Sequence, residues 1–222
     1  MKIAQIASLP DRVKLLKQTI ESLEPQMDRI FVYLNNYEKI PRFIEKSSTT
    51  YGVLCDNLHG DAAKFTDVDQ YKGAYIFTCD DDLVYPSDYA DKMIAGVKKY
   101  RCPVSLHGSV FRKLPIEDYH GDPNKIKYHC LYNVPQDVQA HIVGTGVLCY
   151  KFEHVPGLSL QDFEIRNMAD IWFSKYCKIR GIATVVLKHE EGYIKYLNPS
   201  STIWDQKVND CQLETEIINS YL

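Results

Sequence analysis

The sequence predicts an α/β domain built on a doubly wound, mostly parallel sheet. Short apolar runs typical of buried strands alternate with amphipathic segments of helical period through the first hundred residues. One such run, 74–79, ends in Asp80, Asp81 and Asp82, at the sheet edge where open α/β proteins bind their ligands. The 222 residues are 45% hydrophobic and show no repeat or linker, so we expect one domain over 1–222.

Strands and helices are expected to alternate in the first half of the chain, about 1–100. The expected strands cover 3–7, 29–35, 52–55 and 74–79. The expected helices contain Leu15–Leu23, a turn at 41–46, and the segments 62–71 and 87–100. A strand, helix and strand in this order form a parallel pair with a right-handed crossover, so the loops after the first and second strands meet at one edge.

The second half, about 101–198, is less regular. Strands are expected over 103–107, 138–143, 147–150 and 182–187, with a helix over 166–178. Gly144-Thr145-Gly146 predicts a tight turn that pairs the strands on either side of it. The polar segment 111–135 is predicted to be a long functional loop. A tail, 199–222, holds Trp204 and ends in an amphipathic helix.

Composition excludes several classes of protein. The net charge is −3 and no long block of Lys and Arg is present, which argues against a nucleic-acid partner. No run approaches the roughly 18–20 apolar residues of a membrane span. The seven cysteines are scattered without a CxxC pair, which predicts reduced thiols in a cytoplasmic protein and no zinc site.

The three adjacent aspartates are the most informative motif. Adjacent carboxylates repel each other, so burying them at a strand end costs free energy unless a cation or strong donors lie beside them. Carboxylate oxygens suit Mn²⁺ or Mg²⁺ bound together with phosphate groups. A solvated acidic turn that caps the following helix is the alternative.

The strand ending in this triplet resembles the DxD element of the GT-A glycosyltransferases. With the loop after the first strand, Asp170 in a late helix and His189 after the last strand, the chain is most similar to family 2 and its bacterial polysaccharide-synthesis relatives, over about 3–195. The resemblance implies a single GT-A domain with a nucleotide-binding half followed by an acceptor and catalytic half. It also implies a nucleotide-sugar donor, UDP-sugar by default, and a saccharide or lipid-linked saccharide acceptor that is met at a membrane surface or within a synthase complex.

The same resemblance assigns the donor site. Asp82 and His189 would coordinate Mn²⁺ or Mg²⁺ on the diphosphate. The residues expected to contact the nucleotide are Ser8, Pro10, Arg12, Asn35, Lys64, Asp80 and Asp81. Lys195 is added as a phosphate contact because His189-Glu-Glu-Gly-Tyr-Ile-Lys195 matches the start of a motif of the retaining family 8 enzymes, although Tyr196-Leu197 replaces their Pro-Trp.

The resemblance implies an inverting transfer with Asp170 as the base, and Asp162 is the competitor for that role. A carboxylate among apolar neighbours has its pKa raised toward the range useful for proton abstraction. The residues expected to face the sugar or acceptor are His107, Gly108, Gly144, Thr145 and Gly146, where small residues allow the backbone to approach a ligand.

Three alternatives remain open from the sequence. The first is a retaining, family 8-like transferase. The second is a sugar nucleotidyltransferase, which usually carries a Gly-rich basic loop after its first strand, whereas Ser8-Leu-Pro-Asp-Arg12 has one Arg and no Gly. The third is a non-catalytic module that binds a glycan or a partner protein.

Overall fold

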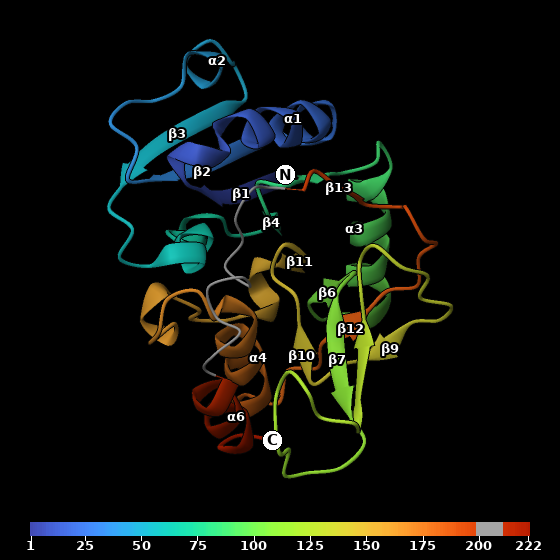
Figure 1. The fold of residues 1–222 in the computed structure, drawn as a ribbon. Helices are drawn as coiled ribbons and strands as arrows, with labels where there is room; N and C mark the ends of the chain where they lie inside the picture. Colours follow the sequence, from blue (N-terminus) through green and yellow to red (C-terminus); the bar gives the residue numbers. More distant parts are fainter. Residues whose placement is uncertain (199–210) are drawn as a thin grey trace.

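The computed structural model describes residues 1–198 and 211–222, and it has the expected mixed α/β fold (Figure 1). The central sheet has eight strands, in the order β3 (Thr50–Cys55), β2 (Arg29–Asn35), β1 (Lys2–Ser8), β4 (Tyr75–Cys79), β11 (Val147–Lys151), β6 (Val104–Ser105), β12 (Val185–Val186) and β9 (Val138–Gln139). The tail segment 199–210, with Trp204, lies outside the described residues.

The ends of several strands lie at one edge of the central sheet. Strands β3, β2, β1 and β4 are parallel, so their carboxyl ends share that edge, confirming the expectation for the loops after Ser8 and Asn35. Strand β11 runs antiparallel to β4 and begins there, because Val147 pairs with Cys79. The first aspartate of the triplet, Asp80, therefore lies beside the residues that precede β11.

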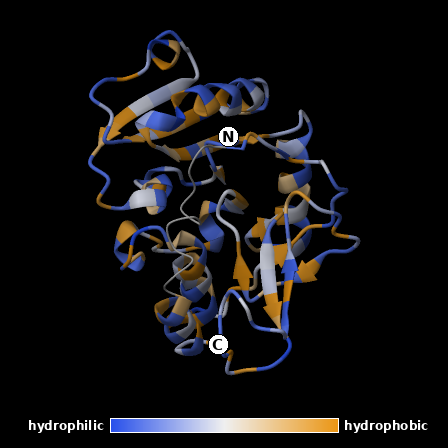
Figure 2. Ribbon diagram, in the orientation of Figure 1, coloured by the Kyte–Doolittle hydropathy of each residue, from blue (hydrophilic) through white to orange (hydrophobic). Residues whose placement is uncertain are grey.

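Helices cover both faces of the sheet (Figures 1 and 2). Strand β4 alternates between two cores: Phe77 packs in the cluster that holds α1 (Val13–Leu23) and α3 (Tyr89–Tyr100), and Ile76 packs in the cluster that holds α4 (Ala169–Ile179). Such alternation is the period of a strand buried on both faces. The remaining helices are α2 (Arg42–Glu45) and the C-terminal α6 (Cys211–Asn219), which packs on α4. The end helix of the tail is thus confirmed.

The structure corrects the expected loop over 111–135. Strands β7 (Gly108–Phe111) and β8 (Lys125–Tyr128) form an antiparallel hairpin that joins β10 (Ile142–Val143) in a separate three-stranded sheet. The expected strand 138–143 is split, because β9 pairs in the central sheet and β10 in the small one. The chain does turn at Thr145 and Gly146, but the predicted pairing across this turn was wrong, because β10 and β11 pair with other strands and not with each other.

Two smaller differences from the expected fold lie near the residues predicted to contact the nucleotide. The helix expected over 62–71 is two 3₁₀ turns, Gly60–Phe65 and Val68–Gln70, separated at Asp67, whose φ is +54°. One short antiparallel ladder was not expected from the sequence. It pairs β5 (Leu83–Val84) with β13 (Lys195–Tyr196), so the segment that follows the last core strand returns to the aspartate triplet. Further 3₁₀ turns lie at Pro10–Arg12, Glu24–Gln26, Phe152–His154 and Leu160–Asp162.

All seven cysteines lie in the described residues and none forms a disulfide, as expected. Within 1–198 and 211–222 no helix combines the length and apolar character needed to cross a membrane.

Candidate active site

A cavity of about 860 Å³ opens at the sheet edge where β1, β2 and β4 end. The residues after these strands supply one side of its wall, and the small sheet, the start of α4 and α6 supply the other. Of the site residues predicted from the sequence, the wall includes Ser8, Arg12, Asn35, Lys64, Asp80, Asp81, Asp82, His107, Gly108, Gly144, Thr145 and Asp170. The fold therefore brings the predicted donor residues and the predicted base to one cavity.

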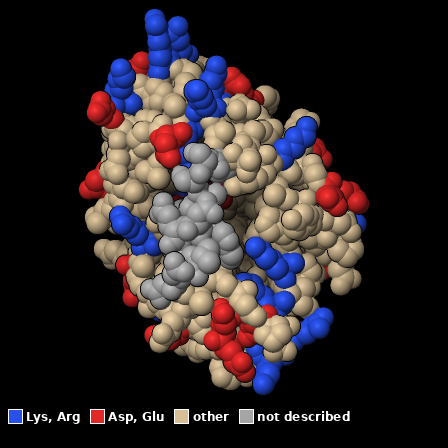
Figure 3. All heavy atoms as spheres, in the orientation of Figure 1, with Lys and Arg blue, Asp and Glu red and all other residues tan. Residues whose placement is uncertain are grey.

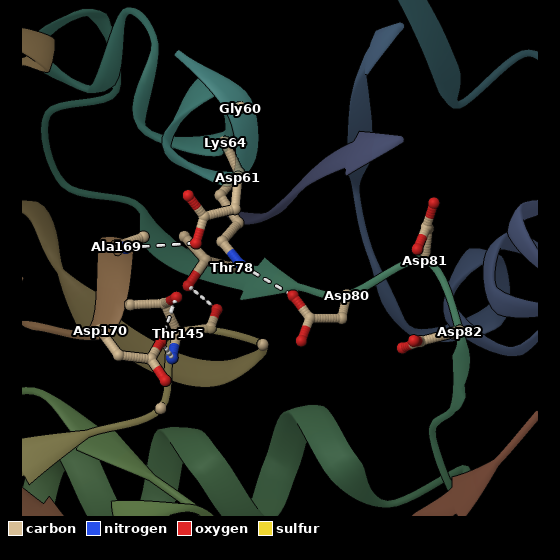
Figure 4. Close-up of polar contacts among 12 residues, drawn as sticks. Gly60, Asp61, Lys64, Thr78, Asp80, Asp81, Asp82, Thr145, Ala169 and Asp170 are labelled. Atoms are coloured by element: carbon tan, nitrogen blue, oxygen red, sulfur yellow. Dashed lines mark hydrogen bonds and ion pairs between the residues drawn. The ribbon is translucent and has the colours of Figure 1, made fainter. Parts of the chain in front are cut away.

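The three aspartates point in different directions and have different partners (Figure 4). Asp80 extends toward Lys64, and its Oδ1 atom accepts a hydrogen bond from Nζ at 2.7 Å. The Lys64 side chain is 3% exposed. Burial acts to lower its pKa, but the charges of nearby carboxylates, chiefly Asp80 and Asp61, outweigh burial and raise it.

Arg12 binds the other two aspartates. One guanidinium nitrogen lies 2.9 Å from Asp81 Oδ1 and 3.2 Å from Asp82 Oδ2. Burial nevertheless raises the pKa of Asp82 to about 7, with Asp80 and Asp81 adding repulsion and Arg12 acting in the opposite direction. Burial raises the pKa of Asp81 as well. The triplet thus carries more negative charge than its protein partners neutralise.

Three buried acceptor atoms near the aspartate triplet have no hydrogen-bond partner within residues 1–198 and 211–222: Asn35 Oδ1, Asp61 Oδ1 and Asp81 Oδ2. Asn35 is 2% exposed, and its Nδ2 atom donates to the Gly60 carbonyl at 2.9 Å, which leaves Oδ1 as the acceptor facing the site. A buried acceptor without a donor costs free energy, so these atoms suit a ligand that brings N–H or O–H groups.

Asp61 is a site residue that the sequence did not single out. Its Oδ2 atom accepts from the backbone N–H of Ala169, at the start of α4, at 3.2 Å (Figure 4). Burial raises its pKa to about 6, against the effect of nearby Lys64. Asp61 therefore links the 3₁₀ turn that carries Lys64 to the helix that carries Asp170.

Asp170 lies in the first turn of α4 and is held on one oxygen. The backbone N–H and the hydroxyl of Thr145 both donate to its Oδ1 atom, at 2.7 and 2.6 Å. Burial raises the pKa of Asp170, while the hydroxyl of Thr145 and then Lys64 act to lower it. This arrangement fixes the orientation of the carboxylate and leaves Oδ2 for another partner.

The predicted glycines create space for protein atoms. A Cβ on Gly146 would lie 1.9 Å from Asp80 Oδ2, one on Gly144 would lie 2.7 Å from the His107 Cβ, and one on Gly108 would lie 2.5 Å from the Ile142 carbonyl oxygen. Gly146 borders a smaller adjoining pocket instead of the main cavity. Close packing around Asp80, His107 and Ile142 thus requires these glycines, and the close approach of a ligand to their backbone stays a prediction.

Besides Gly146, three predicted residues are not among the described residues of the cavity wall: Pro10, His189 and Lys195. Pro10 is exposed in its 3₁₀ turn, and Lys195 is exposed on β13. His189 is 4% exposed, with Nδ1 2.8 Å from the Leu187 carbonyl and Nε2 3.3 Å from the His129 carbonyl. In this conformation the His189 ring faces backbone oxygens, and the structure does not bring it together with Asp82.

The wall opposite the triplet contains residues that the sequence analysis passed over. They come from the β7–β8 hairpin, the segment after β8, and α6: Tyr119, His120, Lys125, Lys127, His129 and Glu214. The one available signal was the alternation Lys125-Ile-Lys127, which has the two-residue period of a strand. This signal was not used because the segment was predicted to be a loop.

No protein-family model matches the chain, and no curated protein matches it in sequence. Its fold does match solved structures. Residues 1–349 of S. aureus TarS superpose with a TM-score of 0.52 and 14% identity, over 86% of this chain and 59% of that fragment. The same fragment in complex with UDP gives a TM-score of 0.53 and 10% identity, over 86% and 58% of the two chains.

A putative glucose-1-phosphate thymidylyltransferase from Bacillus anthracis gives a TM-score of 0.53 and 11% identity, over 99% of this chain and 94% of that one. The present chain spans less than two thirds of the TarS fragment but nearly all of the thymidylyltransferase. At these identities the likeness concerns the fold alone. The chain therefore shares its fold with TarS and with the thymidylyltransferase.

Proposed function

We propose that this protein is a glycosyltransferase that moves a sugar from a nucleotide-diphosphate donor to a saccharide or glycolipid acceptor with inversion. One observation carries the proposal: Asp170, fixed through Oδ1 by Thr145, lines the same cavity as the aspartate triplet and its partners Arg12 and Lys64. A diphosphate site and an oriented carboxylate in one cavity are the two parts that an inverting transfer needs.

A UDP-sugar is the proposed donor. The unpartnered acceptors Asn35 Oδ1, Asp61 Oδ1 and Asp81 Oδ2 match ligand groups that donate, such as ribose hydroxyls and the N3–H of uracil. TarS, which shares this fold, was solved with UDP and with UDP-GlcNAc, and this supports the choice of nucleotide. Arg12 and Lys64 supply positive charge on the side where the diphosphate would lie.

The donor side also suits a divalent cation. The raised pKa of Asp82, near 7, indicates a carboxylate with too little compensating charge, and carboxylate oxygens are hard ligands suited to Mn²⁺ or Mg²⁺. Asp82 and Asp80 would hold the ion, without His189. Once bound, it would neutralise charge on the leaving diphosphate.

The protein groups would act as follows. Asp170 Oδ2 accepts the proton of the acceptor hydroxyl as that oxygen forms a bond to the anomeric carbon. The bond from that carbon to the diphosphate oxygen breaks, and the nucleoside diphosphate leaves with the electron pair. Thr145 keeps Asp170 oriented, and burial keeps its pKa high enough for it to act as a base. Lys64 and Arg12 stabilise the departing negative charge.

A sugar-1-phosphate nucleotidyltransferase is the second candidate, favoured by the match over 94% of the thymidylyltransferase chain. In such an enzyme, sugar phosphate attacks a nucleoside triphosphate and pyrophosphate is released. Against it, the turn after β1 contains no glycine, and its one arginine, Arg12, binds Asp81 and Asp82. Incubating the protein with each nucleoside triphosphate and glucose 1-phosphate, and measuring pyrophosphate, tests this candidate directly.

The first test of the proposal is calorimetric titration of UDP with Mn²⁺ and then with EDTA. We expect binding that depends on the metal and is lost in Asp82→Ala. Asp91→Ala, on the exposed side of α3, is the matched control and should bind as the wild type does. If UDP, GDP, CDP and dTDP all fail to bind, the proposal is wrong and a non-catalytic binding module is favoured.

The second test addresses the chemistry. With a UDP-sugar that binds, Asp170→Asn should keep the affinity for UDP within about twofold and lower sugar transfer by at least about 10²-fold, since a general base contributes about 10²–10⁴-fold. Retained transfer in Asp170→Asn would reject its assignment as the base, and NMR of the product anomer would distinguish inversion from retention.

A further inference from the structure

The cavity is divided by charge into two sides. On the triplet side the wall carries Asp61 and the three consecutive aspartates. On the opposite side the described wall is mostly basic, with Lys125, Lys127 and three histidines. Figure 3 shows Lys and Arg side chains gathered over the small β7–β8 sheet. A cavity that binds a donor diphosphate on one side therefore presents cations to whatever binds on the other.

Strand β8 delivers the two lysines together. Lys125 and Lys127 are two residues apart, so they project from the same face of the strand, and both line the cavity. Lys125 Nζ donates to the Tyr119 carbonyl at 2.7 Å and lies 3.8 Å from the centroid of the Tyr119 ring. These contacts hold the ammonium group at the cavity wall while cation–π attraction partly compensates for lost hydration.

Keeping these cations adjacent in a partly dry cavity costs free energy. Burial, with the charge of Lys127 added, lowers the pKa of Lys125 to about 8. Burial also lowers the pKa of Lys127, while nearby Asp170 acts in the opposite direction. An anion bound near the two ammonium groups would act against this cost, because a nearby negative charge favours the charged form of a lysine.

The histidines on this side favour an anion over a second cation. His107 and His129 pack edge to face with ring centroids 4.6 Å apart, and their ligating atoms lie within 4.8 Å of the Cys130 Sγ. Burial lowers the pKa of both rings, and the positive field of Lys127 lowers both further. That field repels a metal ion. The Nδ1 atom of His129 accepts the Leu131 N–H at 3.2 Å, so its neutral ring carries the proton on Nε2 and can donate it.

The acidic residue on this side, Glu214, has a partner. Its Oε2 atom lies 2.5 Å from His120 Nε2, and the side chain is 5% exposed. Helix α6, which carries Glu214, is hydrogen-bonded to the loop of the β7–β8 hairpin. Thr215 Oγ1 accepts the Tyr119 N–H at 2.9 Å, and the Asn219 side-chain amide accepts from the N–H of Ile116 and donates to its carbonyl. Helix α6 therefore closes this side of the cavity, and Glu214 lies near Lys125 and acts to raise its pKa.

We propose that the acceptor carries an anionic group, a phosphate or a carboxylate, which binds Lys125 and Lys127 beside the hydroxyl that Asp170 deprotonates. This inference rests on the proposed function and adds the chemical class of the acceptor to it. Lys125, Lys127 and Asp170 line the same cavity, so one acceptor molecule can reach the lysines and the base together. The anionic group would thereby orient the acceptor for attack.

The test compares charged and neutral forms of one sugar in the UDP-bound protein. Glucose 6-phosphate, glucuronate and glucose are titrated with UDP and Mn²⁺ saturating, so that the donor side cannot capture the anion. We expect at least one charged sugar to bind about tenfold or more tightly than glucose. Preference for the phosphate or for the carboxylate identifies the source of the charge, and either result supports the proposal.

The variant Lys125→Gln/Lys127→Gln should reduce binding of the charged sugars to the level of glucose and leave UDP affinity unchanged, which also shows that it is folded. Lys113→Gln, an exposed lysine in the same hairpin loop and outside the described cavity wall, is the matched control and should behave as wild type. Equal binding of charged and neutral sugars, absence of binding by all three, or no effect of the double substitution overturns the proposal. Failure of UDP to bind is a separate result that counts against the proposed function, and the same titrations without UDP then test the lysines.

Discussion

The hydroxyl and the backbone N–H of Thr145 converge on a single oxygen of Asp170, at 2.6 and 2.7 Å. Thr145 precedes β11 and Asp170 opens α4, so two elements 25 residues apart in sequence position one carboxylate. Because Oδ1 is occupied by protein donors, Oδ2 is the atom available for an acceptor hydroxyl.

Thr145→Val should therefore affect the chemical step and its pH dependence together. The Thr145 hydroxyl lowers the pKa of Asp170, so its removal raises that pKa and moves the acidic limb of the pH–rate profile to higher pH. We expect kcat to fall about tenfold with little change in UDP affinity. Thr184→Val removes a comparable buried hydroxyl, 3.0 Å from the Ala140 carbonyl, and should leave the profile unmoved. An unchanged acidic limb in Thr145→Val would contradict the positioning role.

Asn35 is expected to read the nucleobase. Its Nδ2 atom is held by Gly60, so the free Oδ1 atom accepts, and uracil N3–H can donate to it whereas cytosine N3 cannot. Wild type should bind UDP at least about tenfold more tightly than CDP, and Asn35→Leu should remove most of that preference. Calorimetry with both nucleotides measures it, and equal binding of CDP by wild type would reject the assignment.

Gly146→Ala should act through Asp80. The added Cβ would lie 1.9 Å from Asp80 Oδ2, so the carboxylate must leave its position beside Lys64. We expect UDP affinity to fall at least about tenfold. Because Asp80→Asn weakens the same ion pair, the two substitutions should be strongly non-additive in a double-mutant cycle. Additive losses would mean that Gly146 acts independently of Asp80.

Asp82→Asn should stabilise the protein at high pH. The folded pKa of Asp82, about 7, exceeds its ordinary value of 3.8, so between these values the folded state holds a proton that the unfolded state has lost. Stability contributed by this group is therefore lost as pH rises from about 4 to 7, and the asparagine variant avoids that loss. At pH 8 we expect Tm to rise by about 2–4 °C, the shift that roughly 1 kcal/mol produces in a chain of this size.

The same variant should show little gain at pH 3, where the carboxyl is largely protonated in both states. Thermal unfolding followed by circular dichroism at both pH values provides the measurement, with the exposed Glu38→Gln as control. A lower Tm for Asp82→Asn at pH 8 would mean that Asp82 is favourably charged through Arg12, contrary to its raised pKa.

Local patterns in the sequence determined the donor half of this protein. Strand β2 begins and ends where its apolar run predicts, and β1, β4 and α1 differ from their expected bounds by few residues. Parallel order then sets Ser8, Asn35 and Asp80 at one edge, because crossover handedness leaves little freedom. The Asp170 helix was likewise foreseen from residues close together in the chain.

Only the tertiary structure decided which charged residues pair and which strands the second half of the chain forms. The pairing of Asp80 with Lys64, of Arg12 with Asp81 and Asp82, and of Asp61 with Ala169 joins separate elements, and no local period encodes such contacts. Strands β7, β8 and β10 are short, and their pairing depends on long-range partners, so the segment resembled a loop. The wall bearing Lys125 and Lys127 exists because that hairpin packs near α6, a contact across about ninety residues of chain that short-range patterns do not report.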